Sequence, residues 1–237
     1  MPGTINYFDP DALFSRRRRK LPHFCQEGAA YFVTFRLGDS IPQARLDFWR
    51  RQYEQWLQSH PSPHTEADLE QVKELGIRRV ERFLDRCHGA CLLKEPTAQD
   101  ALETLMRTRD GVDYDLGDYV IMPNHVHVLF RPIHRVELAE LLGPWRSLSA
   151  KQINNTHSRC GALWQEEYFD HIVRSPDSLL KFRHYIHNNP ANCRRGTARY
   201  NCGSMFSSPL ASSGMVESPN ARLGRHAKKP RSNTRSR

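Results

Sequence analysis

Residues 120–130 read VIMPNHVHVLF, a hydrophobic stretch in which His125 and His127 are separated by one valine. Successive side chains of a β-strand point to opposite faces, so the two histidines would share one face, about 7 Å apart along the strand. Val126 and the alternate residues after it would face the opposite side and pack a core. Two imidazoles on one face can bind one divalent cation through neutral ring nitrogens, or they can be two partly exposed strand histidines.

The length and composition limit the class of protein. A chain of 237 residues can bury one sizeable core and still carry additional segments. It shows no signal peptide and no apolar run near the roughly 20 residues of a membrane span. Six scattered cysteines favour reduced thiols over a disulfide framework. We therefore expect a cytoplasmic protein that does not bind membranes.

The net charge of +9 is unevenly distributed. From residue 203 onward the chain has seven Lys and Arg against one acid, Glu217. A second cluster near the N-terminus consists of five consecutive cations, Arg16, Arg17, Arg18, Arg19 and Lys20. Such clusters suit a nucleic acid, because each phosphate contact releases counterions, although a solvated charge run has the same composition.

Hydrophobic periodicity predicts alternating groups of strands and helices. Aromatic and β-branched residues predict strands at 29–37, 114–121 and 163–173, besides the histidine strand that follows a tight turn at 122–124. Helical spacing predicts helices at 43–59, 66–86, 97–107, 136–156 and 176–188. Gly143 and Pro144 should break the fourth of these helices, and Pro190 should follow the end of the last.

This order of elements resembles an α+β fold with a ferredoxin-like or RRM-like antiparallel sheet. We expect helices on one face and the two histidines on the other, open face. The predicted domains are an irregular basic arm at 1–28, a catalytic domain at 29–195 with a helical insertion at about 40–112, and a basic tail at 203–237. The tail is rich in Ser, Pro and charged residues, which predicts disorder.

The last predicted helix carries a candidate nucleophile. Tyr185 and Asn189 are four residues apart, a spacing that places both on one helical face. A tyrosine hydroxyl beside a divalent cation can attack phosphorus, and the amide oxygen of Asn189 could complete the metal site. Alternatively, Tyr185 packs against the sheet and Asn189 caps the helix. Tyr168 is a rival nucleophile, although an aromatic residue on a strand usually belongs to the core.

Several stretches together resemble the REP-associated branch of the single-tyrosine HUH transposases, the superfamily of IS200-like transposases. They are MPNHVH at 122–127, LWQ at 163–165 with YFDHIVR at 168–174, YIHNNP at 185–190 and YFVTFR at 31–36. The resemblance covers roughly residues 16–195, with the motifs in the expected order. The long segment at 40–112 and the sequence after Pro190 depart from the family pattern.

The resemblance implies a ferredoxin-like enzyme that cleaves and rejoins single-stranded DNA. It implies that His125, His127 and, with an identity that varies among relatives, Asn189 bind Mg²⁺ or Mn²⁺. Tyr185 would form a 5′-phosphotyrosine link and leave a free 3′-hydroxyl, so that no ATP is needed. The implied substrate is a REP-like palindromic hairpin, bound in part by the basic arm, in the bacterial cytoplasm at the nucleoid.

Two other functions fit the same residues. One is an HUH nickase of replication or conjugation, although those chains are usually longer and often carry paired tyrosines. The other is a domesticated single-stranded nucleic-acid-binding protein that no longer cleaves. The branch resemblance and the lack of an obvious apolar interface helix favour a monomer over a dimer with shared active sites.

Overall fold

The computed structural model of the chain describes residues 6–18, 22–60, 65, 68, 76, 78–134, 136–192 and 198–201, and only these residues are discussed below. The described part contains a five-stranded antiparallel sheet with strand order β6-β3-β5-β4-β7. The strands are β3 (Tyr31–Arg36), β4 (Tyr114–Ile121), β5 (His125–Pro132), β6 (Phe169–Ile172) and β7 (Arg199–Asn201). The histidine strand β5 is therefore the middle strand of the sheet.

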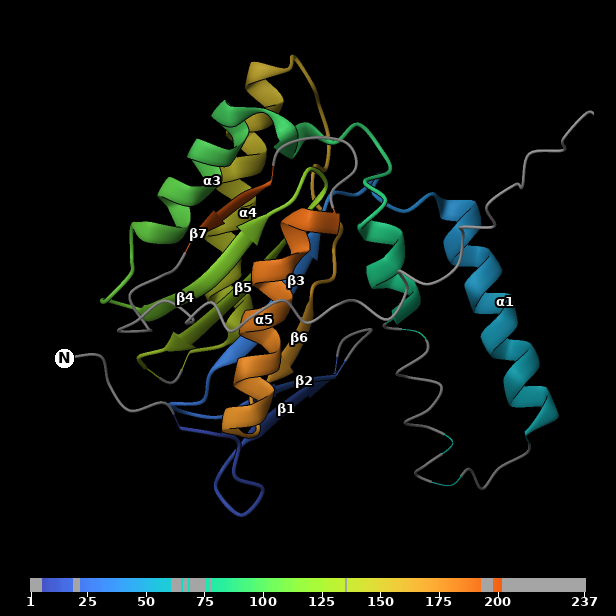
Figure 1. The fold of residues 1–237 in the computed structure, drawn as a ribbon, viewed down its shortest axis with the longest axis vertical. Coiled ribbons are helices and arrows are strands. Elements are labelled where there is room, and N and C mark those ends of the chain that lie inside the picture. The colour runs from blue at the N-terminus through green and yellow to red at the C-terminus, as the bar shows by residue number, and fades with distance from the viewer. Residues whose placement is uncertain are drawn as a thin grey trace, which may run out of the picture.

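Helices cover both faces of this sheet (Figure 1). Two of them, α3 and α4, pack on one face, and α5 packs on the face that carries the histidines. The helices are α1 (Gln43–Ser59), α3 (Pro96–Arg107), α4 (Leu138–Thr156) and α5 (Pro176–Asn192), with a short 3-10 helix η1 (Leu92–Lys94) and helical residues 78–84. No described helix is long and apolar enough to span a membrane.

The alternation of side chains along the strands divides the apolar residues into two cores. Val126, Val128 and Phe130 of β5 belong to the core beneath α3 and α4, as the sequence predicts. Leu129, from the opposite face of the same strand, belongs to a smaller core that Ile186 of α5 completes. The α+β class is thus confirmed, while the prediction of an open histidine face is wrong, because α5 covers it.

A hydrogen-bonded tyrosine joins three elements inside the larger core. The indole nitrogen of Trp145 on α4 donates to the hydroxyl of Tyr114 on β4 at 3.0 Å. That hydroxyl donates in turn to the carbonyl of Met106 on α3 at 2.7 Å. All three residues are buried, so each buried polar group has a partner. These contacts make α3 part of the central core, although the sequence placed residues 97–107 in the insertion.

An irregularity in β4 positions a buried ion pair under α5. Leu116 faces Phe130 and Tyr119 faces Val128, so Gly117 and Asp118 both lie opposite a single residue of β5. This is the geometry of a β-bulge, which re-aims a side chain. The re-aimed Asp118 carboxylate, fully buried, accepts a hydrogen bond of 2.8 Å from Nε of Arg183. The pair ties α5 to the sheet.

Three sequence predictions about helices and strands are wrong. The helix at 138–156 continues through Pro144 instead of breaking, because buried Leu142 and Trp145 hold it on both sides of the proline. The last helix likewise runs through Pro190 to Asn192. Of the strand expected at 163–173, only Phe169–Ile172 pairs as a strand.

The arm at 1–28 is not wholly irregular. Its backbone forms an antiparallel hairpin of β1 (Ser15–Arg18) and β2 (Pro22–Cys25). Arg16, Arg17 and Arg18 lie in β1, whereas Arg19 and Lys20 lie outside the described residues. The predicted tail at 203–237 also lies outside them.

The Asp118–Arg183 pair gives a stability prediction. Arg183→Met leaves a buried carboxylate without its partner and should lower the free energy of unfolding by about 3–5 kcal/mol. The double variant Asp118→Leu/Arg183→Met removes both charges and should lose clearly less than the single variant. Urea unfolding followed by circular dichroism measures both losses. Equal losses in the two variants would show that the ion pair itself is not responsible.

Candidate active site

The two histidines lie at the start of β5, on the face covered by α5. The backbone amide of Met122 donates to the carbonyl of His125 at 2.8 Å, which closes the turn that the sequence predicts at 122–124. The amide of Leu37, just after β3, donates to the carbonyl of Asn124 at 2.9 Å and fixes this turn against the neighbouring strand. Both histidine side chains are fully buried. The local backbone therefore holds them in place without any ligand.

Hydrogen bonds determine which nitrogen of His125 carries the proton. The amide nitrogen of Asn124 donates to the carbonyl of His88 at 3.0 Å, which leaves the amide oxygen of Asn124 as an acceptor. This oxygen lies 2.7 Å from Nδ1 of His125. Nδ1 must then donate, so Nε2 of His125 carries a free lone pair.

The hydroxyl of Thr34 contacts the corresponding ring nitrogen of His127. Its Oγ1 lies 2.7 Å from Nδ1 of His127. If this hydroxyl accepts, Nε2 of His127 also carries a lone pair; if it donates, Nε2 of His127 carries a proton that points at His125. Hydrogen-bond partners of this kind fix the orientation of metal-binding histidines. Sequence reasoning assigned no part to Thr34 or to Asn124.

The two Nε2 atoms are 3.0 Å apart. Two ring nitrogens this close together could bind the same divalent cation. Burial lowers the pKa of His125 to about 3, and burial together with the adjacent His125 lowers the pKa of His127 well below its usual value. Both rings are thus neutral at pH 7, as metal ligation requires.

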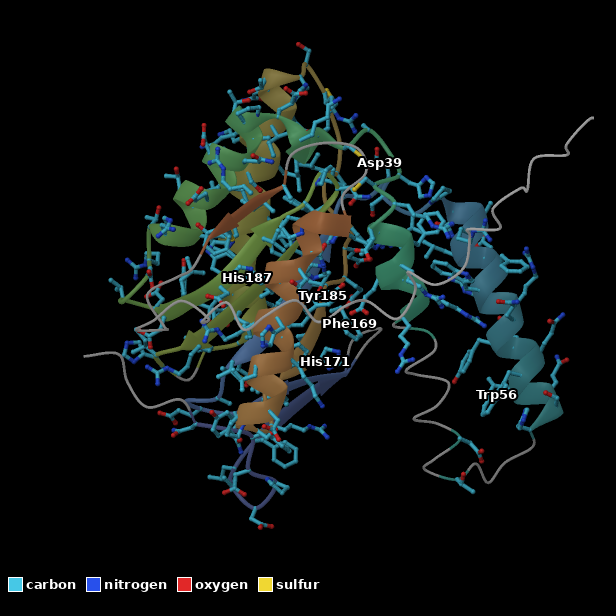
Figure 2. The ribbon with its side chains drawn as sticks, viewed as in Figure 1. Asp39, Trp56, Phe169, His171, Tyr185 and His187 are labelled. Atoms are coloured by element: carbon cyan, nitrogen blue, oxygen red, sulfur yellow. The ribbon has the colours of Figure 1, made fainter. Side chains whose placement is uncertain are left out.

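Tyr185 of α5 lies next to this pair, and Asn189 follows it one turn later on the same helix. The rings of Tyr185 (labelled in Figure 2) and His127 meet edge to face with centroids 5.0 Å apart. The Tyr185 hydroxyl and both polar atoms of the Asn189 amide are buried without a hydrogen-bond partner in the described part of the chain. Buried polar atoms without partners are costly, so their gathering beside two histidines indicates a place for an ion, a water or a substrate.

Two carboxylates that the sequence analysis did not select also act on Tyr185. Burial raises the pKa of Glu81 to about 7 and that of Asp85 to about 6. Burial first, and then the charges of these two residues, raise the pKa of Tyr185 far above its usual value, while Asn189 lowers it slightly. One carboxylate oxygen of Asp85 is buried with no hydrogen-bond partner among the described residues. The segment treated as an insertion of unknown role thus contributes to the electrostatics of the site.

The structure separates the other candidates from the histidine pair. Tyr168, the rival nucleophile, is buried in the core on the α3 and α4 side of the sheet. In the described part, no three His, Cys, Asp or Glu side chains come together as a metal site. Among the described residues, the buried amide of Asn189 is a candidate for a further ligand of another type.

Residues 88–189 match a family model described as "Transposase IS200 like". This segment is therefore similar to the IS200-like transposases. The matched segment begins at His88, whose carbonyl accepts a hydrogen bond from Asn124, and ends at Asn189. It contains both histidines and Tyr185.

Comparison with solved structures finds a chain described as the REP-associated tyrosine transposase bound to a REP hairpin. The similarity extends over 75% of this chain and 73% of that chain, with 16% sequence identity and a TM-score of 0.40. No curated protein matches the sequence.

Burial of the neutral histidines predicts a pH-dependent stability. In the unfolded chain, His125 and His127 become protonated as pH falls below about 6.5. In the folded chain both stay neutral further down, His125 until about pH 3, so the pair destabilises the fold as pH falls through this range. Glu81 and Asp85, with raised pKa values, act in the opposite direction over the same range.

A variant comparison isolates the histidine contribution. The carboxylate contributions cancel between the wild type and a His125→Gln/His127→Gln variant. As pH falls from 6.5 to 4, the wild type should lose unfolding free energy relative to this variant. The loss should be up to about 1.4 kcal/mol per pH unit for each histidine. Urea unfolding at several pH values measures this change. A constant difference would mean that the folded protein protonates its histidines normally.

Proposed function

We propose that the protein cleaves single-stranded DNA by attack of the Tyr185 hydroxyl on a backbone phosphate, and rejoins the cut strand to another. One observation supports this proposal. The rings of Tyr185, from α5, and His127, on β5, meet edge to face, so the proposed nucleophile lies next to two neutral imidazoles whose Nε2 atoms are 3.0 Å apart. The motif resemblance at 122–127 and 185–190 supports the same pairing.

The residues present fit a divalent cation. Two Nε2 atoms 3.0 Å apart and the unpartnered amide oxygen of Asn189 offer a mixed nitrogen and oxygen set suited to Mn²⁺ or Mg²⁺. Such an ion, when bound, would polarise the scissile phosphate and offset its charge. Thr34 and Asn124 would hold the two rings in the binding orientation.

The reaction conserves the phosphodiester. A bond forms between the Tyr185 oxygen and phosphorus while the bond from phosphorus to the 3′-oxygen breaks. The tyrosine proton is lost, and the departing 3′-oxygen ends as a hydroxyl after gaining a proton. The strand is left with a 5′-phosphotyrosine link, and attack by another 3′-hydroxyl reverses the step without ATP. Burial raises the pKa of Tyr185, so its hydroxyl is protonated at neutral pH and must lose its proton during the attack.

We propose a hairpin-forming single strand as the substrate, on the strength of the resemblance to the REP-associated branch. The basic arm around Arg16 would contact its phosphates, and exposed aromatic residues would stack on unpaired bases. A binding protein without catalysis, or a nickase that cuts but does not rejoin, would produce a different pattern in the assay below.

Tyr185→Phe tests the nucleophile. Because the hydroxyl has no hydrogen-bond partner among the described residues, its removal should leave stability unchanged or slightly raised while abolishing the covalent link. Wild-type protein incubated with Mn²⁺ and a labelled single-stranded hairpin should give an adduct that survives denaturing electrophoresis, whereas the variant should bind the hairpin without forming it.

Tyr168→Phe is the matched control, since it changes a buried tyrosine of the opposite core. It should form the adduct at the wild-type level. Loss of the adduct in this variant alone would transfer the nucleophilic role to Tyr168. Binding without adduct in the wild type under all metals would indicate a domesticated binding protein, and cleavage without rejoining would indicate a nickase.

His125→Ala tests the ion. It should lose both the adduct and the stabilisation by Mn²⁺, which for the wild type amounts to about 2.7 kcal/mol at a hundred times the dissociation constant. Asn189→Ala should weaken Mn²⁺ binding without abolishing it, and His134→Ala, at an exposed position after β5, should behave as wild type. Thermal unfolding with and without Mn²⁺ and adduct formation in EDTA provide the measurements. An undiminished adduct in EDTA would rule out the proposed ion.

A further inference from the structure

Arg36, the last residue of β3, lies beside the histidine pair. It faces His125 across the strand pair, and Thr34 faces His127. Residues opposite each other in an antiparallel pair project to the same face with Cβ atoms about 5 Å apart. The Arg36 side chain therefore starts on the face that carries both histidines, next to His125.

The guanidinium of Arg36 has no carboxylate partner in the described part of the chain. One of its nitrogens, Nη1, donates to the hydroxyl of Ser40 at 3.1 Å and to the carbonyl of Leu37 at 3.4 Å. Several other arginines do pair with carboxylates: Arg109 with Asp113, Arg131 with Asp115, Arg183 with Asp118, and Arg199 with Asp100 and Glu103. Among the described residues no carboxylate pairs with the half-buried Arg36, and burial lowers its pKa.

The nearest acidic residue in sequence is engaged elsewhere. Asp39 (Figure 2) accepts a hydrogen bond of 2.8 Å from the backbone amide of Ala90. Its neighbour Ser40 is fully buried and donates to the carbonyl of Leu37 at 2.7 Å. Residues of the turn after β3 thus accept hydrogen bonds from Nη1 of Arg36. The Nε and Nη2 atoms of the same guanidinium have no hydrogen bond in the described part.

We propose that Arg36 binds a phosphate of the DNA strand at the cleavage site. This inference rests on the proposed function and names a phosphate-binding residue of the same site. A partly buried cation is costly unless an anion approaches it, and a phosphodiester supplies one negative charge with oxygens spaced for the two donors of a guanidinium edge. With Arg36 beside His125 and Tyr185 beside His127, positive charge and nucleophile flank one position on the sheet face.

The position of Arg36 suits charge stabilisation during phosphoryl transfer. Negative charge on the non-bridging oxygens must be held while Tyr185 attacks, and a prepositioned donor does so without reorganisation. Its position is coupled to the histidines by backbone contacts, because Leu37 donates to Asn124, the residue whose amide oxygen holds His125.

Arg36→Gln and Arg36→Lys test the proposal, with Arg159→Gln as the matched control at an exposed position after α4. The assays measure hairpin affinity at several salt concentrations and the rate of adduct formation. Arg36→Gln should reduce the slope of log affinity against log salt by about 0.7, the contribution of one phosphate contact on a single strand, and slow adduct formation about 100-fold or more. Arg36→Lys should keep the slope and slow the reaction at least about tenfold, and Arg159→Gln should change neither.

The outcomes separate this inference from the proposed function. If the wild type forms the adduct and Arg36→Gln changes neither the salt dependence of affinity nor the rate of adduct formation, the phosphate contact is overturned. The proposed function is then unaffected. Absence of any wild-type adduct overturns the proposed function, and the salt slope alone then decides the phosphate contact. If circular dichroism shows that Arg36→Gln is unfolded, Arg36→Lys decides, and wild-type cleavage in that variant contradicts the proposal.

Discussion

The contact between the Nε2 atoms of His125 and His127 is the interaction on which the site depends. Two neutral imidazoles are held edge to face in a fully buried position, and the other nitrogen of each contacts a neighbouring side chain. Such an arrangement is sustainable only because β5 is the central strand, with Val126 and Val128 anchoring the opposite face in the larger core. Because successive side chains of β5 point to opposite faces, one face of this strand packs in the larger core and the other face carries the histidine pair.

Contacts on either side of Tyr185 hold helix α5 against the sheet. Phe182, one turn before Tyr185, stacks on Phe32 with ring centroids 4.5 Å apart, and Phe32 stacks in turn on His127 at 5.4 Å. Ile186 is fully buried in the smaller core. These contacts fix the rotation of α5 about its axis, so the unpartnered Tyr185 hydroxyl is kept inside the site although no hydrogen bond in the described part retains it.

The sequence predicts the parts of the fold that depend on local pattern. The helix Gln43–Ser59 and the strand Tyr114–Ile121 have the predicted limits, because spacing and turn residues determine them. Pro144 misled the prediction, since packing on both sides outweighs one lost backbone donor. The covered histidine face was also missed, because the pattern of α5 does not say on which side of the sheet it packs.

The residues of the site also differ in how far the sequence alone could predict them. The pairing of His125 with His127 follows from strand periodicity, whereas Tyr185 required the family resemblance to be preferred over an ordinary packed tyrosine. Thr34 and Arg36 join the site through the register of β3 against β5, which links residues about 90 positions apart in the chain and has no local signature. A strand read in isolation shows only that these two residues alternate with apolar ones.

The segment just before the family match contacts the site through His88, the first residue of the match. Phe83 stacks on the ring of His88 at a centroid distance of 4.4 Å, and the carbonyl of His88 accepts a hydrogen bond from Asn124, which orients His125. Asp85 precedes His88 by three residues and lies close enough for its charge to raise the pKa of Tyr185. The segment therefore adds two ionisable carboxyls to the surroundings of Tyr185.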